Sequence, residues 1–132
     1  MVSTSEQVMH AYMTDVTLLE QTNFWLKIMD GWKREIGRVM KRSELVNASP
    51  AVTAEVARTA GELSTFAEQL NDLYTEIDYH KIQLPSSEIQ ERTWRKEHEY
   101  LYRKLGRRGE QFRGLLTVMF RLDKEAYRRF LC

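Results

Sequence analysis

The residues best suited to chemistry in this chain are three histidines, His10, His80 and His98, and a single cysteine, Cys132. Histidine is a common metal ligand and a common general base near neutral pH. Di-iron helical bundles place a glutamate three residues before a histidine on one helix face, and none of the three histidines follows a glutamate at that spacing. The three also fall at different levels of the bundle inferred below, so we do not expect them to share a metal ion.

Other catalytic signatures are missing from the sequence. It has no glycine-rich phosphate loop of known spacing, no paired cysteines, and no serine or cysteine with an evident base. The start, Met1–Glu6, lacks the basic and apolar regions of a secretory signal, and the longest largely apolar run, Leu115–Phe120, is far shorter than the ~20 residues of a membrane span. A lone cysteine favours a reducing compartment. We therefore expect a cytoplasmic protein that is no enzyme, holds no cofactor or metal, and does not cross a membrane.

The composition favours helix and a single hydrophobic core. Of the 132 residues, 42% are hydrophobic and only 2 are proline, which argues against disorder. Leucine, glutamate, arginine and alanine are good helix formers, and the length suits one core. We expect an all-α protein in which residues 1–132 form one helical-bundle domain.

Apolar residues recur every three or four positions along three segments, the spacing of amphipathic helices. The first segment follows a capping box at Ser3–Glu6 and ends at Val46 or Asn47. The second begins with Ser49 as its cap and a proline in its first turn, and ends between residues 80 and 82. The third follows a second capping box at Ser87–Gln90 and continues to Leu131.

The two connections, near residues 47–49 and 82–86, are short enough to force antiparallel neighbours. The predicted fold is an elongated antiparallel three-helix bundle with a long C-terminal helix. Gly106 and Gly109 could instead break the third segment and produce a four-helix bundle. If both turns are symmetric, Trp32 lies level with Gly106 and near Gly61 and Gly109, so these glycines could make room for its indole.

The same symmetric register places His98 in a polar layer of the core. The layer's other members are Thr22, Asn23, Asn71 and Asp72. A buried polar layer can fix helix register at some cost in stability. We expect His98 to be at least partly buried there and to serve structure rather than catalysis or metal binding.

The unequal helix lengths predict an overhang from Arg121 onward, where the other two helices have ended. This tail continues the apolar stripe, and burial of each such side chain is worth roughly 1.5–3 kcal/mol, so a second subunit or a helical partner should cover it. The expected apolar contacts are Leu122, Tyr127, Phe130 and Leu131, rimmed by the basic residues Arg121, Arg128 and Arg129.

Charge is distributed unevenly although the formal net charge is only +1. The second segment is acidic and the third is basic, which suits either pairing between adjacent helices or an anionic partner. Our first hypothesis is a non-enzymatic interaction module, such as an assembly, adaptor or chaperone component, that forms a homo-oligomer or binds a helical protein through its apolar stripes. The alternative is binding of nucleic acid or an anionic membrane surface by the basic third segment.

Overall fold

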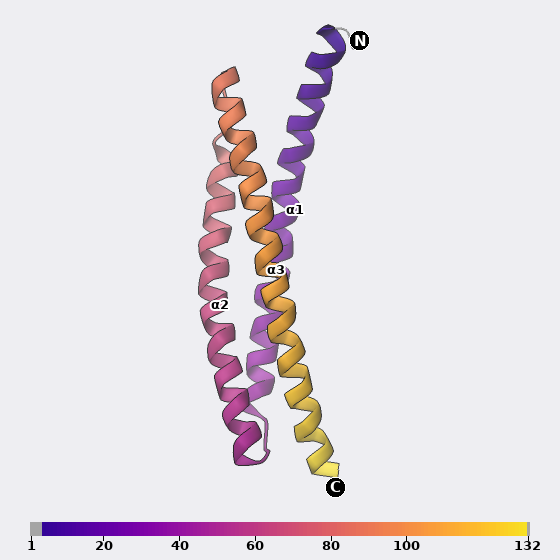
Figure 1. Ribbon diagram of the computed structural model, residues 1–132, viewed down its shortest axis with the longest axis vertical. Coiled ribbons are helices and arrows are strands. Elements are labelled where there is room, and N and C mark those ends of the chain that lie inside the picture. The colour runs from indigo at the N-terminus through magenta and orange to yellow at the C-terminus, as the bar shows by residue number, and fades with distance from the viewer. Residues whose placement is uncertain (1–3, 132) are drawn as a thin grey trace.

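The computed structural model describes the backbone of residues 4–131 and the side chains of residues 17–126. It consists of three helices, α1 (Thr4–Glu44), α2 (Pro50–Ile82) and α3 (Glu88–Leu131), packed side by side along one long axis (Figure 1). Residues 4–131 contain no β-strand. The all-α prediction, the three-helix arrangement and the long C-terminal helix are confirmed.

Local side-chain chemistry fixes where α2 and α3 begin. The Ser49 side chain accepts a hydrogen bond from the Val52 amide at 3.3 Å, and Pro50 occupies the first turn, where its missing amide proton costs nothing. At the start of α3 the Ser87 hydroxyl accepts from the Gln90 amide at 3.2 Å, while the Gln90 side chain accepts from the Ser86 amide at 2.9 Å. The capping box expected at Ser3–Glu6 lies outside the described side chains.

The core is a continuous stripe along all three helices. Its fully buried members on α2 recur every three or four residues, as an amphipathic helix requires. The largest of them is Phe66, whose ring stacks on that of Phe112 from α3 with centroids 5.5 Å apart. The buried apolar residues of α2 are Val56, Leu63, Phe66, Leu70, Leu73 and Ile77.

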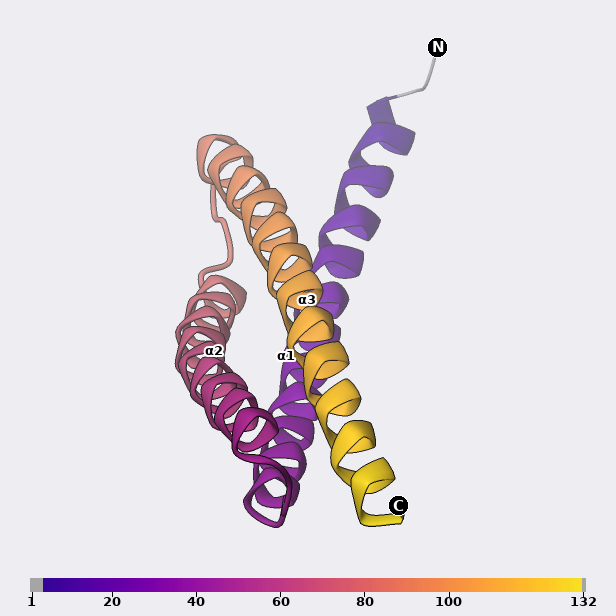
Figure 2. The same cartoon turned by 60° about the horizontal axis from the view of Figure 1, so that its bottom comes forward.

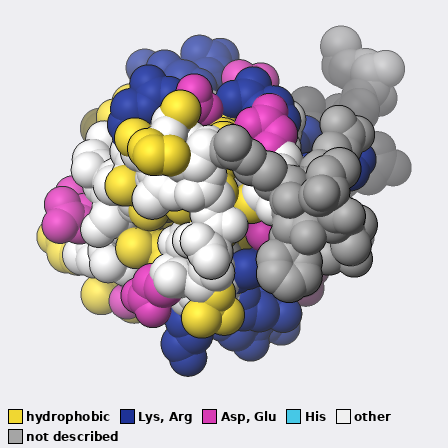
Figure 3. All heavy atoms as spheres, turned by 90° about the horizontal axis from the view of Figure 1, so that it is seen from below, with side chains coloured by type: hydrophobic (Ala, Val, Ile, Leu, Met, Phe, Trp, Pro, Cys, Tyr) yellow, Lys and Arg dark blue, Asp and Glu magenta, His cyan; other side chains and the backbone are white. Residues whose placement is uncertain are grey.

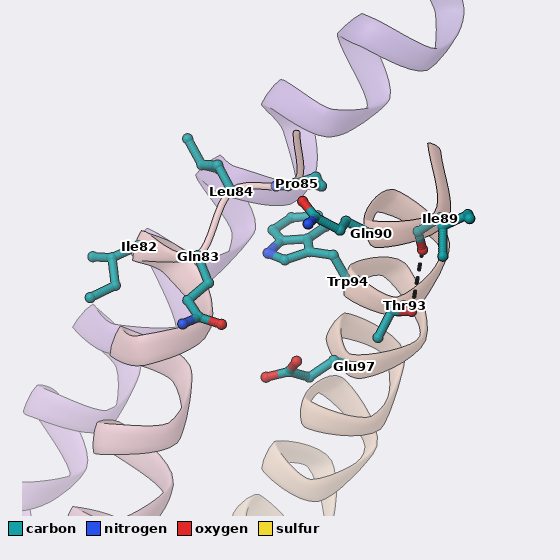
Figure 4. A pocket seen from close by; sticks show the side chains of 9 residues that line it. All are labelled: Ile82, Gln83, Leu84, Pro85, Ile89, Gln90, Thr93, Trp94 and Glu97. Atoms are coloured by element: carbon teal, nitrogen blue, oxygen red, sulfur yellow. Dashed lines mark hydrogen bonds between the residues drawn. The ribbon is translucent and has the colours of Figure 1, made fainter. Parts of the chain in front are cut away.

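The register between α2 and α3 differs from the symmetric one assumed from the sequence. A symmetric turn places Asp72 level with His98, whereas the structure places His80 there, about two helical turns further along α2. The cause is the linker, residues 83–87, which extends upward past the end of α2 before α3 starts (Figures 1 and 4). Pro85 disfavours helical geometry in the residue before it, so the chain cannot turn back at once.

α3 is one unbroken helix through both of its central glycines, so the alternative four-helix bundle with a break at Gly106–Gly109 is wrong. The idea that a glycine makes room for Trp32 holds at Gly109, where an added Cβ would lie 3.2 Å from Cη2 of that indole. At Gly61 and Gly106 an added Cβ would meet nothing within 4 Å. Only one of the three glycines therefore accommodates the tryptophan.

The first turns of α1 diverge from the other two helices (Figures 1 and 2). α2 and α3 share the largest interface, α1 and α2 a slightly smaller one, and α1 touches α3 least. The side of the bundle between α1 and α3 is consequently its most open side.

Candidate functional site

A chain of polar side chains crosses the core near the upper end of the bundle and joins all three helices. His80 of α2 and His98 of α3 face each other, with Nε2 of His80 3.3 Å from Nδ1 of His98. Nε2 of His98 lies 3.1 Å from Oε1 of Gln21 on α1. Nδ1 of His80 lies 3.4 Å from Oε1 of Glu97, near enough for an ion pair when His80 is protonated but not aligned as a hydrogen bond. We call these four residues the histidine network.

Two tryptophans enclose the network. The His80 ring stacks on Trp94 with centroids 4.4 Å apart, and the His98 ring stacks on Trp25 of α1 at 4.5 Å. The Trp94 indole also donates a hydrogen bond to the backbone carbonyl of His80 at 3.0 Å. As a result both histidines are buried, although Glu97 remains half exposed to water.

This burial disfavours the charged form of both rings. Desolvation lowers the pKa of His80, and the nearby Glu97 carboxylate partly offsets that effect. Desolvation lowers the pKa of His98 to about 4, and the positive charges of protonated His80 and of Arg95 add to the shift. At neutral pH burial therefore favours the uncharged form of both rings.

The polar layer expected around His98 is only partly present. His98 and Thr22 are buried, but the Thr22 hydroxyl donates to the Leu19 carbonyl of its own helix at 2.6 Å. Asn23, Asn71 and Asp72 are exposed, so their placement in the core layer is wrong. The two-turn register shift explains the error for α2, because it brings His80 rather than Asp72 opposite His98.

The spacing of buried residues on α2 includes a sequence signal for His80. His80 follows Ile77 by three residues and so continues the buried stripe of α2 by one step. His98 lies on the corresponding stripe of α3. Pairing the two histidines would have given the register between α2 and α3 that the structure shows. Among residues whose side chains are described, no group of three or more histidine, cysteine, aspartate or glutamate side chains could hold a metal ion.

The expected overhang at Leu122 does not exist. Leu122 has no exposed surface and packs into the core of the same chain, and Ala126 is buried as well. Arg121 forms an ion pair with Glu55 at 3.7 Å, and Asp123 pairs with Arg42 at 2.9 Å, so α2 and α1 both reach this level of α3. The side chains of Tyr127, Arg128, Arg129, Phe130 and Leu131 lie outside the described residues.

An apolar groove runs instead along the open side between α1 and α3. Phe24, Ile28 and Trp32 form one wall at helical spacing, and Tyr102 with Gly106 forms the other. The cleft has a volume of about 530 Å³. Phe24 and Tyr102 are each 62% exposed, which is unusual for large apolar rings that lie in one groove. We call these residues, together with Gly109 and Phe112 at its floor, the aromatic groove.

The charged residues that line the aromatic groove are Arg103 and Arg113, and no acidic side chain is among the described residues lining it. Arg103 forms an ion pair with Glu99 one turn away, whereas Lys104 and Arg108 point to α2 and bond to Glu76 and Gln69. The bond to Glu76 raises the pKa of Lys104. Seen from the lower end, the basic side chains gather on two opposite sides with apolar atoms between them (Figure 3).

A second apolar surface lies at the linker end of the bundle. Ile82, Leu84 and Ile89 are all largely exposed there, around a cleft of about 540 Å³ with Trp94 on one side (Figure 4). The exposed carboxylate of Glu97 and the amide of Gln90 also line it. This cleft is more polar than the aromatic groove.

Neither the fold nor these sites resemble a known family closely enough to define one. No family model, no curated protein and no solved structure matches the chain. Within the described residues, no helix is both long and apolar enough to span a membrane. The protein is defined by its architecture, an all-α three-helix bundle with apolar side chains exposed on its open side.

Proposed function

We propose that this protein is a non-enzymatic interaction module that binds an amphipathic helix of a partner protein in the aromatic groove. The observation that carries the proposal is the exposure of Phe24 and Tyr102 beside the half-buried Ile28 and Trp32 in one continuous groove. Burial of each exposed ring is worth roughly 1.5–3 kcal/mol, so an occupant that covers both gains substantial affinity.

A helix is the occupant whose shape fits best. The groove lies between two helices, and Phe24, Ile28 and Trp32 follow each other at intervals of four residues along α1. A partner helix laid between α1 and α3 would turn the three-helix bundle into four, with apolar residues at every third or fourth position facing the groove. Gly106 leaves space at the α3 wall of the groove, since none of the neighbouring atoms lies within 4 Å of the position of its missing Cβ.

Charge complementarity specifies the polar side of that partner. The groove presents Arg113, and also Arg103, which already pairs with Glu99 outside the lining, so acidic residues beside the apolar stripe of the partner would pair with Arg113 first. A second copy of this chain would need such an acidic amphipathic face. α3 is basic, and the apolar stripe of α2 is already buried in the core. A separate acidic helix is therefore the occupant to which we commit.

The experiment uses two designed helical peptides with the same leucine stripe, one flanked by glutamate and the other by lysine. We expect the full chain to bind the glutamate peptide with micromolar affinity by calorimetry and the lysine peptide at least about tenfold more weakly. Phe24→Ala and Tyr102→Ala should each weaken binding roughly tenfold or more, by loss of about 1.5 kcal/mol of buried apolar surface. Tyr79→Ala, which removes an exposed ring outside the groove, is the matched control.

Failure of both peptides to bind, or an equal loss in the Tyr79 control, would refute the proposal. Nucleic acid is the competing occupant, because aromatic rings and arginines can stack on unpaired bases. Tight, strongly salt-dependent binding of a single-stranded oligonucleotide with no binding of the glutamate peptide would replace our proposal with that one. A dimer detected by light scattering and disrupted by Phe24→Ala would identify a second copy as the occupant.

A further inference from the structure

The histidine network has a property that goes beyond the proposed binding function and does not depend on it. Its hydrogen bonds can be completed in two ways that differ by one proton. The direction of the Gln21 amide decides between them, because its oxygen accepts and its nitrogen donates.

In the observed orientation the Gln21 oxygen accepts from Nε2 of His98. Nδ1 of His98 must then accept, so Nε2 of His80 donates across the 3.3 Å contact. A proton on the remaining Nδ1 of His80, directed toward Glu97, makes the pair singly charged and places that charge 3.4 Å from a carboxylate oxygen. Without that proton, Nδ1 of His80 is a buried acceptor with no donor.

If the Gln21 amide turns over, the two hydrogen bonds of His98 reverse and the pair is neutral. The amide nitrogen donates to Nε2 of His98, Nδ1 of His98 donates to Nε2 of His80, and Nδ1 of His80 keeps its proton toward Glu97. The network can therefore hold zero or one positive charge with each of its contacts still formed. A second proton cannot be accommodated, because both nitrogens of the His80–His98 contact would then be donors.

We propose that the histidine network is an acid-sensitive attachment of the upper part of α1 to the α2–α3 hairpin, which opens when the histidine pair takes up its second proton. α1 is the helix that covers His98, because Gln21 hydrogen bonds to that ring and Trp25 stacks on it. Two charged rings in contact repel each other, and departure of α1 would expose His98 to water, which solvates the second charge. Just above this level α1 separates from α3 (Figures 1 and 2). Loss of these contacts would extend that separation downward toward the aromatic groove, where Trp25 also lies.

The groups that face the pair favour release in acid. α3 contributes Glu97 next to His80 and Arg95 near His98, and Arg95 is paired with Glu91. On α2, Glu76 lies one turn before His80 and is bonded to Lys104, and Asp78 is exposed. α1 contributes the neutral Gln21, and its neighbour Glu20 is exposed. The Glu97 carboxylate compensates a charge on His80, but burial lowers the pKa of both rings, so a second charge on the pair is disfavoured while α1 covers it.

The experiment compares hydrogen exchange of α1 amides in residues 17–30 with that of α2 amides in residues 60–75, between pH 7 and pH 4, after correction for intrinsic exchange rates. We expect protection of the α1 segment to fall at least about tenfold more than that of α2 as the pH drops from 6 to 4. His98→Gln, whose amide can accept and donate without becoming charged, should abolish this difference. Glu97→Gln should move the transition to higher pH, because the charge on His80 loses its partner.

The proposal fails if α1 and α2 lose protection in parallel, or if His98→Gln behaves like the parent chain. Should that variant not fold, the ring resonances of the unmodified protein decide the matter by NMR. Two histidines that titrate independently near their ordinary value would overturn the proposal, and a shared first proton with a second uptake that coincides with α1 opening would support it. No partner is present in either measurement, so failure of the groove proposal leaves this test unaffected.

Discussion

The two sides of α3 differ in how completely they are covered. Toward α2, α3 packs against fully buried leucines, stacks Phe112 on Phe66 and is tied by polar contacts such as Lys104 to Glu76 at 2.8 Å. Toward α1 it presents Phe112 to Trp32 and leaves Tyr102 largely exposed beside Phe24. One side is a closed core and the other is an open groove lined by aromatic rings.

The difference arises from side-chain size rather than from a lack of apolar residues. α2 meets α3 with leucine, isoleucine and one phenylalanine, which interdigitate closely. α1 meets α3 with Trp25, Ile28 and Trp32, and among the described glycines Gly109 is the one whose missing Cβ leaves room for an indole. The rings of Phe24 and Tyr102 therefore keep most of their surface exposed on this side, and that surface is available to a partner.

The largest expected effect comes from replacing one aromatic residue on each side of α3 by alanine. Phe66→Ala removes a ring with no exposed surface and should lower the free energy of unfolding by about 3–5 kcal/mol. Phe24→Ala removes a ring that is already mostly in water and should change it by less than about 1 kcal/mol. Urea denaturation followed by circular dichroism measures both. Comparable losses would show that the two sides are equally closed.

The lower end of α3 provides a second test, because the sequence predicted exposure there and the structure shows burial. Leu122→Ala should destabilise the folded chain by about 2–4 kcal/mol, since its side chain has no exposed surface. Phe120→Ala, a change at the neighbouring exposed ring, is the matched control and should have little effect. A Leu122 variant that keeps its stability but loses self-association would contradict this burial and support the overhang predicted from the sequence.

Acid should destabilise the chain through the histidine network, which joins all three helices near the upper end of the bundle. The pKa of His98 is about 4 in the folded chain and near 6.5 when unfolded, so the unfolded state binds more protons between those values. Stability contributed by neutral His98 is thus complete above about pH 6.5, decreases as the pH falls, and is lost by about pH 4, a change of up to about 3 kcal/mol. Urea midpoints at pH 7 and pH 5 for the parent chain and His98→Gln measure it. A steeper acid loss in the variant would contradict this assignment.

The smallest expected effect concerns the two central glycines of α3. Gly106→Ala should stabilise the chain by about 0.5–1 kcal/mol, because alanine favours helix and its Cβ would enter open space. Gly109→Ala gains the same propensity, but its Cβ would lie 3.2 Å from Trp32, so it should stabilise less or destabilise. Thermal unfolding of both variants checks the order. If Gly109→Ala proved the more stable, the indole would have room to move.

The helices could be predicted from the sequence because their signals are local. Capping by Ser49 and Ser87, proline at the start of α2 and the three-to-four-residue apolar spacing all act within one or two turns. The register between α2 and α3 could not be predicted from the sequence in the same way. It depends on the path of the five linker residues, which the spacing of apolar residues does not encode. That single error displaced the partner of His98 from His80 to Asp72 and made Leu122 appear to overhang.

The histidine network also has a consequence for the order of folding. Only 18 residues separate His80 from His98 along the chain, whereas 77 separate Gln21 from His98. Because loop-closure entropy grows with the logarithm of length, the second contact costs roughly 1 kcal/mol more to close than the first. The α2–α3 hairpin should therefore assemble early, with His98 already paired to His80, and the upper turns of α1 should join it afterwards.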